Sequence, residues 1–179
     1  MKSKSLTYLE KPIFNQRQLV ALIQKTPVEF VRERKGRGGM SFKYTTVSYV
    51  QDRLNQIFGW GWSFEVKEHG QSPEGSVWVL GKLTILDQET KQILVTKEQF
   101  GSSEYKKDRA GKEIDFADDL KSAASDALKK SASLMGLAAD LYATEEVSEE
   151  IDKRVKAVVA EIIEKKKEEN AEPKPTEIK

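Results

Sequence analysis

The sequence predicts an α+β fold in which helices pack on one face of an antiparallel β-meander. Three segments rich in β-branched and aromatic residues lie close together, separated by turn-type residues. A segment with small apolar residues at helical spacing follows them, at 117–135. Small side chains let a helix lie close to a sheet, so we expect this helix to cover one face of the meander. The strands are predicted at residues 62–67, 77–86 and 93–100.

Two helices are predicted ahead of the meander. A short one begins after its cap Asn15 and ends before Pro27, and residues 28–34 are predicted as a strand after it. A longer one begins after its cap Thr46, and Gly59 ends it. Their apolar stripes are Leu19, Leu22 and Ile23 in the first helix and Val47, Val50, Leu54, Ile57 and Phe58 in the second.

Three side chains near the first strand need an interpretation. Trp60 and Trp62 flank Gly61 where that strand begins, and His69 follows the strand. The tryptophans are expected to pack in the core or at its rim, with base stacking as the alternative. His69 is expected in an exposed turn, because the chain has no second His and no Cys with which it would bind a metal.

The helix at 117–135 is amphipathic. Residues 101–115, which precede it, are polar and are predicted as a long basic loop. The apolar side of the helix comprises Leu120, Ala124, Ala127, Leu128, Leu134 and Met135. Its polar side comprises Asp119, Ser122, Asp126, Lys129, Lys130 and Ser133.

A charged helix is predicted from Glu145 to about Glu169, and Pro173 and Pro175 mark a frayed end after it. Its narrow apolar stripe has two interpretations. It covers part of the chain's own core, or it docks on a neighbouring subunit. The stripe comprises Ile151, Val155, Val158, Val159 and Ile162.

Length and composition exclude several classes of protein. The 179 residues suit one modest domain with solvated appendages. The absence of cysteine excludes a disulfide framework, a Cys/His zinc site and a cysteine nucleophile, and favours a reducing compartment. No run of residues approaches the roughly 18 apolar positions of a membrane span, and no apolar stretch follows the basic start, so no secretory signal is expected.

The charge is unevenly distributed along the chain. Residues 145–179 hold 11 acids and 8 bases, whereas residues 1–43 hold 10 bases and 3 acids. Within the basic part, residues 32–39 combine four cationic side chains with three glycines. Glycines let backbone N–H groups and cations approach an anion together, so this stretch suits a phosphate cradle, with a solvated hairpin loop as the alternative.

Candidate catalytic groups are few. The acidic cluster Asp115, Asp118 and Asp119, with Glu104 nearby, would suit Mg²⁺-dependent phosphodiester cleavage. Acids in a first helical turn are also favoured by the helix dipole without any function, and adjacent helical residues point about 100° apart. Residues 81–84 lack the glycine spacing of a phosphate-binding P-loop, so ATP hydrolysis is not supported. We therefore expect no catalytic residue, no metal and no cofactor, and predict that the protein is not an enzyme.

Several stretches carry a resemblance. They are Phe100-Gly101-Ser102-Ser103-Glu104, the block Ala124-Ser125-Asp126-Ala127-Leu128-Lys129-Lys130 with Met135-Gly136 after it, and Phe58-Gly59-Trp60-Gly61-Trp62 after Tyr44 and the helix through Leu54. Together they resemble the Rad52 family of single-strand annealing proteins, a broad group that includes phage Sak annealases and the DdrA proteins of radiation-resistant bacteria. The resemblance covers roughly residues 28–142, and residues 145–179 take no part in it.

The resemblance implies a β-β-β-α core that assembles side by side into a homo-oligomeric ring, with single-stranded DNA in a basic groove around the outside. Arg34, Lys129 and Lys130 match family positions that hold the phosphate backbone, and Ser133 stands where many relatives carry a further base. The early basic segment adds three DNA-binding candidates, and the basic loop adds two where the family has a second DNA-contacting surface. These candidates are Lys35, Arg37 and Lys43, and Lys106 and Lys107.

We therefore expect an ATP-independent protein of homologous recombination and DNA repair that binds single-stranded DNA and anneals it to a complementary strand. The alternatives are the Mg²⁺-dependent nuclease, and an adaptor whose tail recruits a single-strand-binding protein or a recombinase. The predicted organisation is an N-terminal helical segment at 1–27, an annealing core at 28–142, and a charged helix with a disordered tail at 143–179. No membrane partner is expected, and the predicted location is the cytoplasm of a bacterial or phage-infected cell, with the nucleoid.

Overall fold

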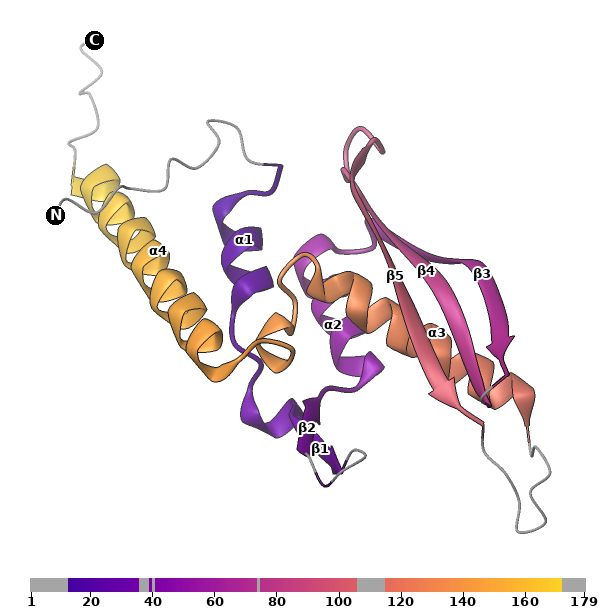
Figure 1. Ribbon diagram of the computed structural model, residues 1–179. Helices are drawn as coiled ribbons and strands as arrows, with labels where there is room; N and C mark the ends of the chain where they lie inside the picture. Colours follow the sequence, from indigo (N-terminus) through magenta and orange to yellow (C-terminus); the bar gives the residue numbers. More distant parts are fainter. Residues whose placement is uncertain (1–12, 36–38, 40, 74, 106–114, 172–179) are drawn as a thin grey trace, which may run out of the picture.

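The computed structural model describes residues 13–35, 39, 41–73, 75–105 and 115–171. The fold is α+β, as predicted (Figure 1). In chain order its elements are α1 (Gln16–Ile23), η1 (Val28–Phe30), β1 (Arg32–Lys35), β2 (Ser41–Tyr44), α2 (Val47–Phe58), β3 (Trp62–Ser72), β4 (Ser76–Leu86), β5 (Ile93–Glu104), α3 (Phe116–Ser133), η3 (Ala139–Leu141) and α4 (Glu145–Ala171).

The three-stranded sheet has the order β3-β4-β5 and is antiparallel throughout, which confirms the predicted meander. The strands are longer than predicted because pairing continues to both ends of β4, where Ser76 lies opposite Glu104. Residues 101–104 therefore belong to β5, and the prediction of a loop there was wrong. The prediction of a turn at His69 was also wrong, since His69 lies inside β3 opposite Val79.

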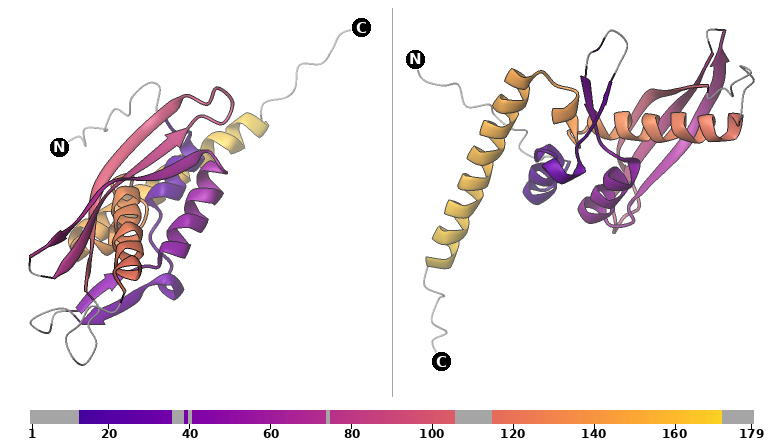
Figure 2. Two further views of the ribbon diagram at one scale, coloured as in Figure 1. Left: turned by 90° about the vertical axis from the view of Figure 1, so that its right-hand side faces the viewer. Right: turned by 90° about the horizontal axis from the view of Figure 1, so that it is seen from below.

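Helix α3 lies along one face of this sheet, and α2 lies beside α3 on the same side (Figure 2). Two glycines let α3 approach closely. A Cβ atom on Gly101 of β5 would lie 2.1 Å from the backbone nitrogen of Ala127, and one on Gly81 of β4 would lie 2.9 Å from the Ala127 Cβ. Ala123 and Ala127 are fully buried in this contact. The small residues on both elements therefore determine how close the helix lies to the sheet.

The α3 register differs in part from the predicted wheel. Asp119, placed on the polar side, is fully buried, and Leu134, placed on the apolar side, is half-exposed. Ala123, Ser131 and Ala132 are also fully buried, which rotates the buried stripe towards positions that the helical wheel did not include. The predicted burial of Ala127 and Leu128 is confirmed.

Helices α1 and α2 begin and end where the sequence predicted. The Asn15 side chain accepts a hydrogen bond from the backbone of Gln18, and Thr46 caps α2 by accepting one from the Tyr49 N–H. Gly59 ends α2 with φ of +59°, a conformation that other residues rarely adopt. The apolar faces of both helices enter the same core as the sheet and the end of α3, which buries Leu22, Leu54, Leu83, Leu128 and Leu137.

The segment between α1 and α2 forms a turn and a hairpin. Residues 28–34 were predicted as one strand, but Val28–Phe30 is a 3₁₀ turn in which the Phe30 N–H donates to the Pro27 carbonyl. The Phe30 ring stacks on Tyr49 at 4.7 Å between centroids, and its carbonyl accepts from the Thr45 hydroxyl. These contacts favour the turn over an extended chain. The strand begins only at Arg32, and β1 pairs with β2 as an antiparallel hairpin.

Helix α4 lies at the end of the molecule away from the sheet and contacts α1 and η3 (Figure 1). Val155 is buried there, which supports the interpretation that the apolar stripe covers part of the chain's own structure. Other apolar residues of α4, Val147 and Ile163, are half-exposed. Among the described helices, none has the length and hydropathy needed to cross a bilayer.

Candidate nucleic-acid interface

Three basic side chains from two distant parts of the sequence come together beside the end of α3. Lys129 and Lys130 project from α3, and Arg34 projects from β1 of the hairpin. Burial lowers the pKa of Lys129 below its ordinary 10.5; the Asp126 carboxylate opposes this shift, and the Arg34 and Lys130 charges lower the pKa further. The Arg34 and Lys130 charges thus both act on Lys129, and the three side chains are called here the basic cluster.

Lys129 is held more firmly than a solvated lysine. Its side chain is only 17% exposed, and its Nζ lies 5.8 Å from the centre of the Tyr44 ring. An ammonium at this distance from a tyrosine ring gains from a cation–π interaction. The prediction that Lys129 and Lys130 lie on the solvated face of α3 therefore holds better for Lys130, whose side chain is 37% exposed.

Asp126 is the acid that both lysines share. Its Oδ2 lies 2.9 Å from the Lys130 Nζ and accepts a hydrogen bond of 3.2 Å from the backbone N–H of Ser102 in β5. Its Oδ1 lies 3.8 Å from the Lys129 Nζ. This carboxylate therefore joins the cluster to the edge of the sheet.

The hairpin separates the basic residues that the sequence grouped together. Directly paired residues of an antiparallel hairpin share a face, and neighbours along a strand alternate between faces. The pairs Arg32–Tyr44 and Arg34–Phe42 therefore share the face of the Tyr44 ring that contacts Lys129. Lys35 and Lys43 belong to the other face, where Lys43 pairs with Glu33. Arg37, Lys106 and Lys107 lie outside the described residues.

Two aromatic side chains near the basic cluster, Tyr142 and Phe42, were not predicted as part of a site. Tyr142 follows η3 and is half-exposed; burial raises the pKa of its hydroxyl, Asp126 raises it further, and Arg34 lowers it. Phe42 is also half-exposed, opposite Arg34. Tyr142 reaches this site because the chain reverses after α3, where Gly136 has φ of +105°. No local pattern in the sequence predicts this approach.

Trp60, predicted to pack in the core or at its rim, does neither. It is 88% exposed at the turn between α2 and β3, so the prediction of core or rim packing was wrong for this residue. Trp62 does pack against the core, and its Nε1 donates to the Asn55 side chain. Gly59 and Gly61 on either side of Trp60 keep the turn tight and leave the ring in solvent.

The acidic cluster has structural partners. Asp115 caps α3, and its Oδ1 accepts hydrogen bonds from the N–H groups of Ala117 and Asp118. Asp118 pairs with Lys121 at 3.3 Å, and Asp119 is buried under the helix. Across the part of the chain that the structure describes, no three His, Cys, Asp or Glu side chains gather as a group that would hold a metal ion.

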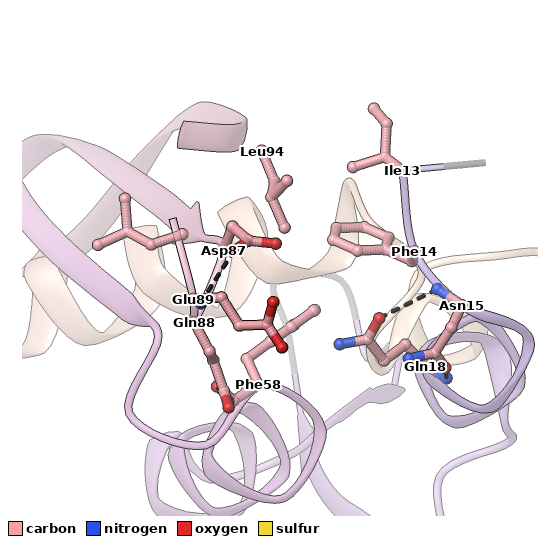
Figure 3. A pocket seen from close by; sticks show the side chains of 10 residues that line it. Ile13, Phe14, Asn15, Gln18, Phe58, Asp87, Gln88, Glu89 and Leu94 are labelled. Carbon is pink, nitrogen blue, oxygen red and sulfur yellow. Dashed lines mark hydrogen bonds between the residues drawn. The ribbon is translucent and has the colours of Figure 1, made fainter. Parts of the chain in front are cut away.

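A cleft of about 450 Å³ lies apart from the basic cluster, between the start of α1, the end of α2 and the β4–β5 turn (Figure 3). Its polar lining includes the acids Asp87 and Glu89, and no Lys or Arg lines it. Such a lining repels phosphate, so this cleft does not extend the cationic surface.

The chain was compared with known proteins. A search of curated proteins found no relative that matches it. The model of the Rad52/22 family of double-strand break repair proteins matches residues 15–158, which include all three members of the basic cluster. The match is to the family as a whole, and the Sak-like or DdrA-like subtype stays a prediction. Because the match covers most of the chain, this protein belongs to the Rad52/22 family, whose members bind DNA and act in its recombination and repair.

Proposed function

We propose that this protein binds single-stranded DNA through the basic cluster and anneals it to a complementary strand without ATP. The observation that carries the proposal is that Arg34 of β1 shares a hairpin face with Tyr44, whose ring lies 5.8 Å from the Nζ of Lys129, the neighbour of Lys130 on α3. Surface lysine pairs are common on helices. A third cation brought to the same place by a separate hairpin is different, because like charges repel one another and some favourable interaction must offset the repulsion. A phosphate that binds between β1 and α3 would supply that interaction.

Backbone contacts explain how such a site would anneal DNA. Contacts to phosphates do not read the base sequence, so any single strand fits, and the bases stay free to pair. Pairing supplies the driving energy, since stacking in duplex DNA is worth about 1.4 kcal/mol per step. The protein needs only to hold and align strands, and no nucleotide cofactor is required.

The proposal includes a homo-oligomeric ring. In the described part of the chain, β3 and β5 each have one edge that pairs with no other strand. Long open edges favour pairing with another chain, and proteins usually cover them. Side-by-side assembly of copies would cover these edges and join the basic clusters into a continuous track for the DNA backbone.

Further partners and the location belong to the same proposal. The charged helix α4 lies at the end of the molecule away from the sheet, which leaves much of its surface available to a single-strand-binding protein or a recombinase. We divide the chain into an N-terminal helical segment at 1–27, an annealing core at 28–142 and a C-terminal segment at 143–179. Recruitment of a partner protein is the role proposed for the C-terminal segment. An annealing protein of this kind would work in the cytoplasm, with the nucleoid.

The double variant Lys129→Ala/Lys130→Ala tests the site. We expect it to lose annealing of complementary oligonucleotides while its oligomeric state, measured by light scattering, stays unchanged. The matched control is Lys153→Ala/Lys156→Ala, which removes two lysine charges from α4 instead. A double variant of α3 that anneals as fast as the control would refute the assignment of these lysines.

A further inference from the structure

Asp126 occupies the centre of the basic cluster, although a carboxylate repels the phosphates proposed to bind there. Its side chain is 24% exposed, and it lies on α3 three residues before Lys129 and four before Lys130. On a helix these spacings place all three side chains on one face. The acid is thus a fixed neighbour of both proposed phosphate contacts.

The backbone of β5 prevents this carboxylate from turning away. The same oxygen, Oδ2, accepts from the Ser102 N–H at 3.2 Å and lies 2.9 Å from the Lys130 Nζ. This arrangement depends on the close approach of α3 to β5 at Gly101, directly before Ser102. A neutral asparagine oxygen would accept the Ser102 hydrogen bond equally well. The negative charge is therefore not needed to join the helix to the strand.

The charge changes what the cluster offers to DNA. Arg34, Lys129 and Lys130 supply three positive charges, and Asp126 cancels one of them. A phosphate that approaches the ammonium groups competes with a carboxylate already in contact with them. We propose that Asp126 is a positioning residue that orients Lys129 and Lys130 and limits how tightly they hold single-stranded DNA, an inference that rests on the proposed function.

Limited affinity suits a protein that must release its strand once the duplex forms. A cluster of three unopposed cations would hold the single strand longer and delay its transfer to the complement. The predicted effect of neutralising Asp126 is therefore a gain in binding together with a loss in the rate of strand transfer. These two changes have opposite signs, and general damage to the protein would not produce them together.

Asp126→Asn tests this inference, because it removes the charge and keeps the acceptor for Ser102. The control is Asp152→Asn on α4, where Asp152 pairs with Lys156 at 2.7 Å with the same four-residue spacing that joins Asp126 to Lys130. Binding of labelled oligothymidine is measured across a salt series, and the rate of its annealing to oligoadenine, expected to fall in Asp126→Asn, is measured alongside. We expect Asp126→Asn to bind about threefold to tenfold more tightly than the control. We also expect its plot of log K against log salt to be steeper by about 0.7, the slope for one more cation–phosphate contact on a single strand.

The outcomes separate this inference from the proposed function. If the unaltered protein binds no oligothymidine, the proposed function fails. If it binds and Asp126→Asn has the same affinity and salt slope as Asp152→Asn, only the role of Asp126 is refuted, and the carboxylate is a structural link alone. Weaker binding by Asp126→Asn refutes the role as well. Should the asparagine variant lose cooperative unfolding, Asp126→Ser also removes the charge, although its shorter side chain does not reach the Ser102 N–H, and it is compared with Asp152→Ser in the same measurements.

Discussion

Gly101→Ala is predicted to disrupt the packing of α3 on the sheet, on which the proposed site depends. The new Cβ would lie 2.1 Å from the Ala127 nitrogen and 2.3 Å from the Ala123 carbonyl oxygen, far inside van der Waals contact. Both atoms belong to the helix backbone, so the whole of α3 must move by about 1 Å, and overpacking of this kind costs about 3 kcal/mol. For a protein of this size the melting temperature should fall by about 6–12 °C, since each kcal/mol corresponds to about 2–4 °C.

Differential scanning calorimetry measures this change, and Gly70→Ala is the matched control. A Cβ on Gly70 would meet the Trp78 ring at 2.6 Å, and Trp78 is a partly buried side chain that can shift, whereas the atoms facing Gly101 belong to a helix backbone. Both variants add one methyl group to a strand glycine, so the difference between them isolates the helix contact. A Gly101→Ala protein that melts within about 2 °C of Gly70→Ala would refute the close packing of α3 on β5.

Two further predictions concern the titration of the cluster and the acidic cap. Burial lowers the pKa of Lys129, so its ammonium loses its proton, and DNA affinity falls, at a lower pH than for an ordinary lysine of pKa 10.5. Lys129→Arg keeps its charge and should retain affinity in alkaline buffer. If the affinity of Lys129→Arg and that of the unaltered protein fall in parallel between neutral pH and pH 10.5, the prediction is contradicted. Asp115→Ala removes the α3 cap and should lower the melting temperature by about 2–4 °C, for a loss of about 1 kcal/mol. Incubation with Mg²⁺ should leave DNA at full length with either protein, and shortened strands would instead support the nuclease alternative.

Local patterns predicted much of the fold because their causes are local. The caps Asn15 and Thr46 lie beside the helices that they begin, and the 3.6-residue spacing of Val50, Leu54 and Phe58 needs no tertiary information. The meander was also predictable, since its strands are consecutive and rich in β-branched residues. The resemblance supplied the expectation about the two lysines on α3.

The parts that sequence reasoning missed depend on contacts between distant segments. The end of β5 is polar and is a strand only because β4 pairs with it as far as Ser76. The hairpin register, not the sequence of the basic segment, separates Arg34 from Lys35 and Lys43. The link between Asp126 and Ser102 joins residues 24 positions apart, and it requires the glycine at 101 to let the helix approach the strand.

Annealing of two labelled complementary oligonucleotides without ATP tests the central claim most directly. The reaction is followed at low and high salt, with and without Mg²⁺, and the strands are checked for length afterwards. We predict that the protein accelerates pairing, that salt weakens the acceleration because phosphate contacts are ionic, and that the strands stay intact. No acceleration, or shortened strands, would contradict the claim that this protein is an annealing protein.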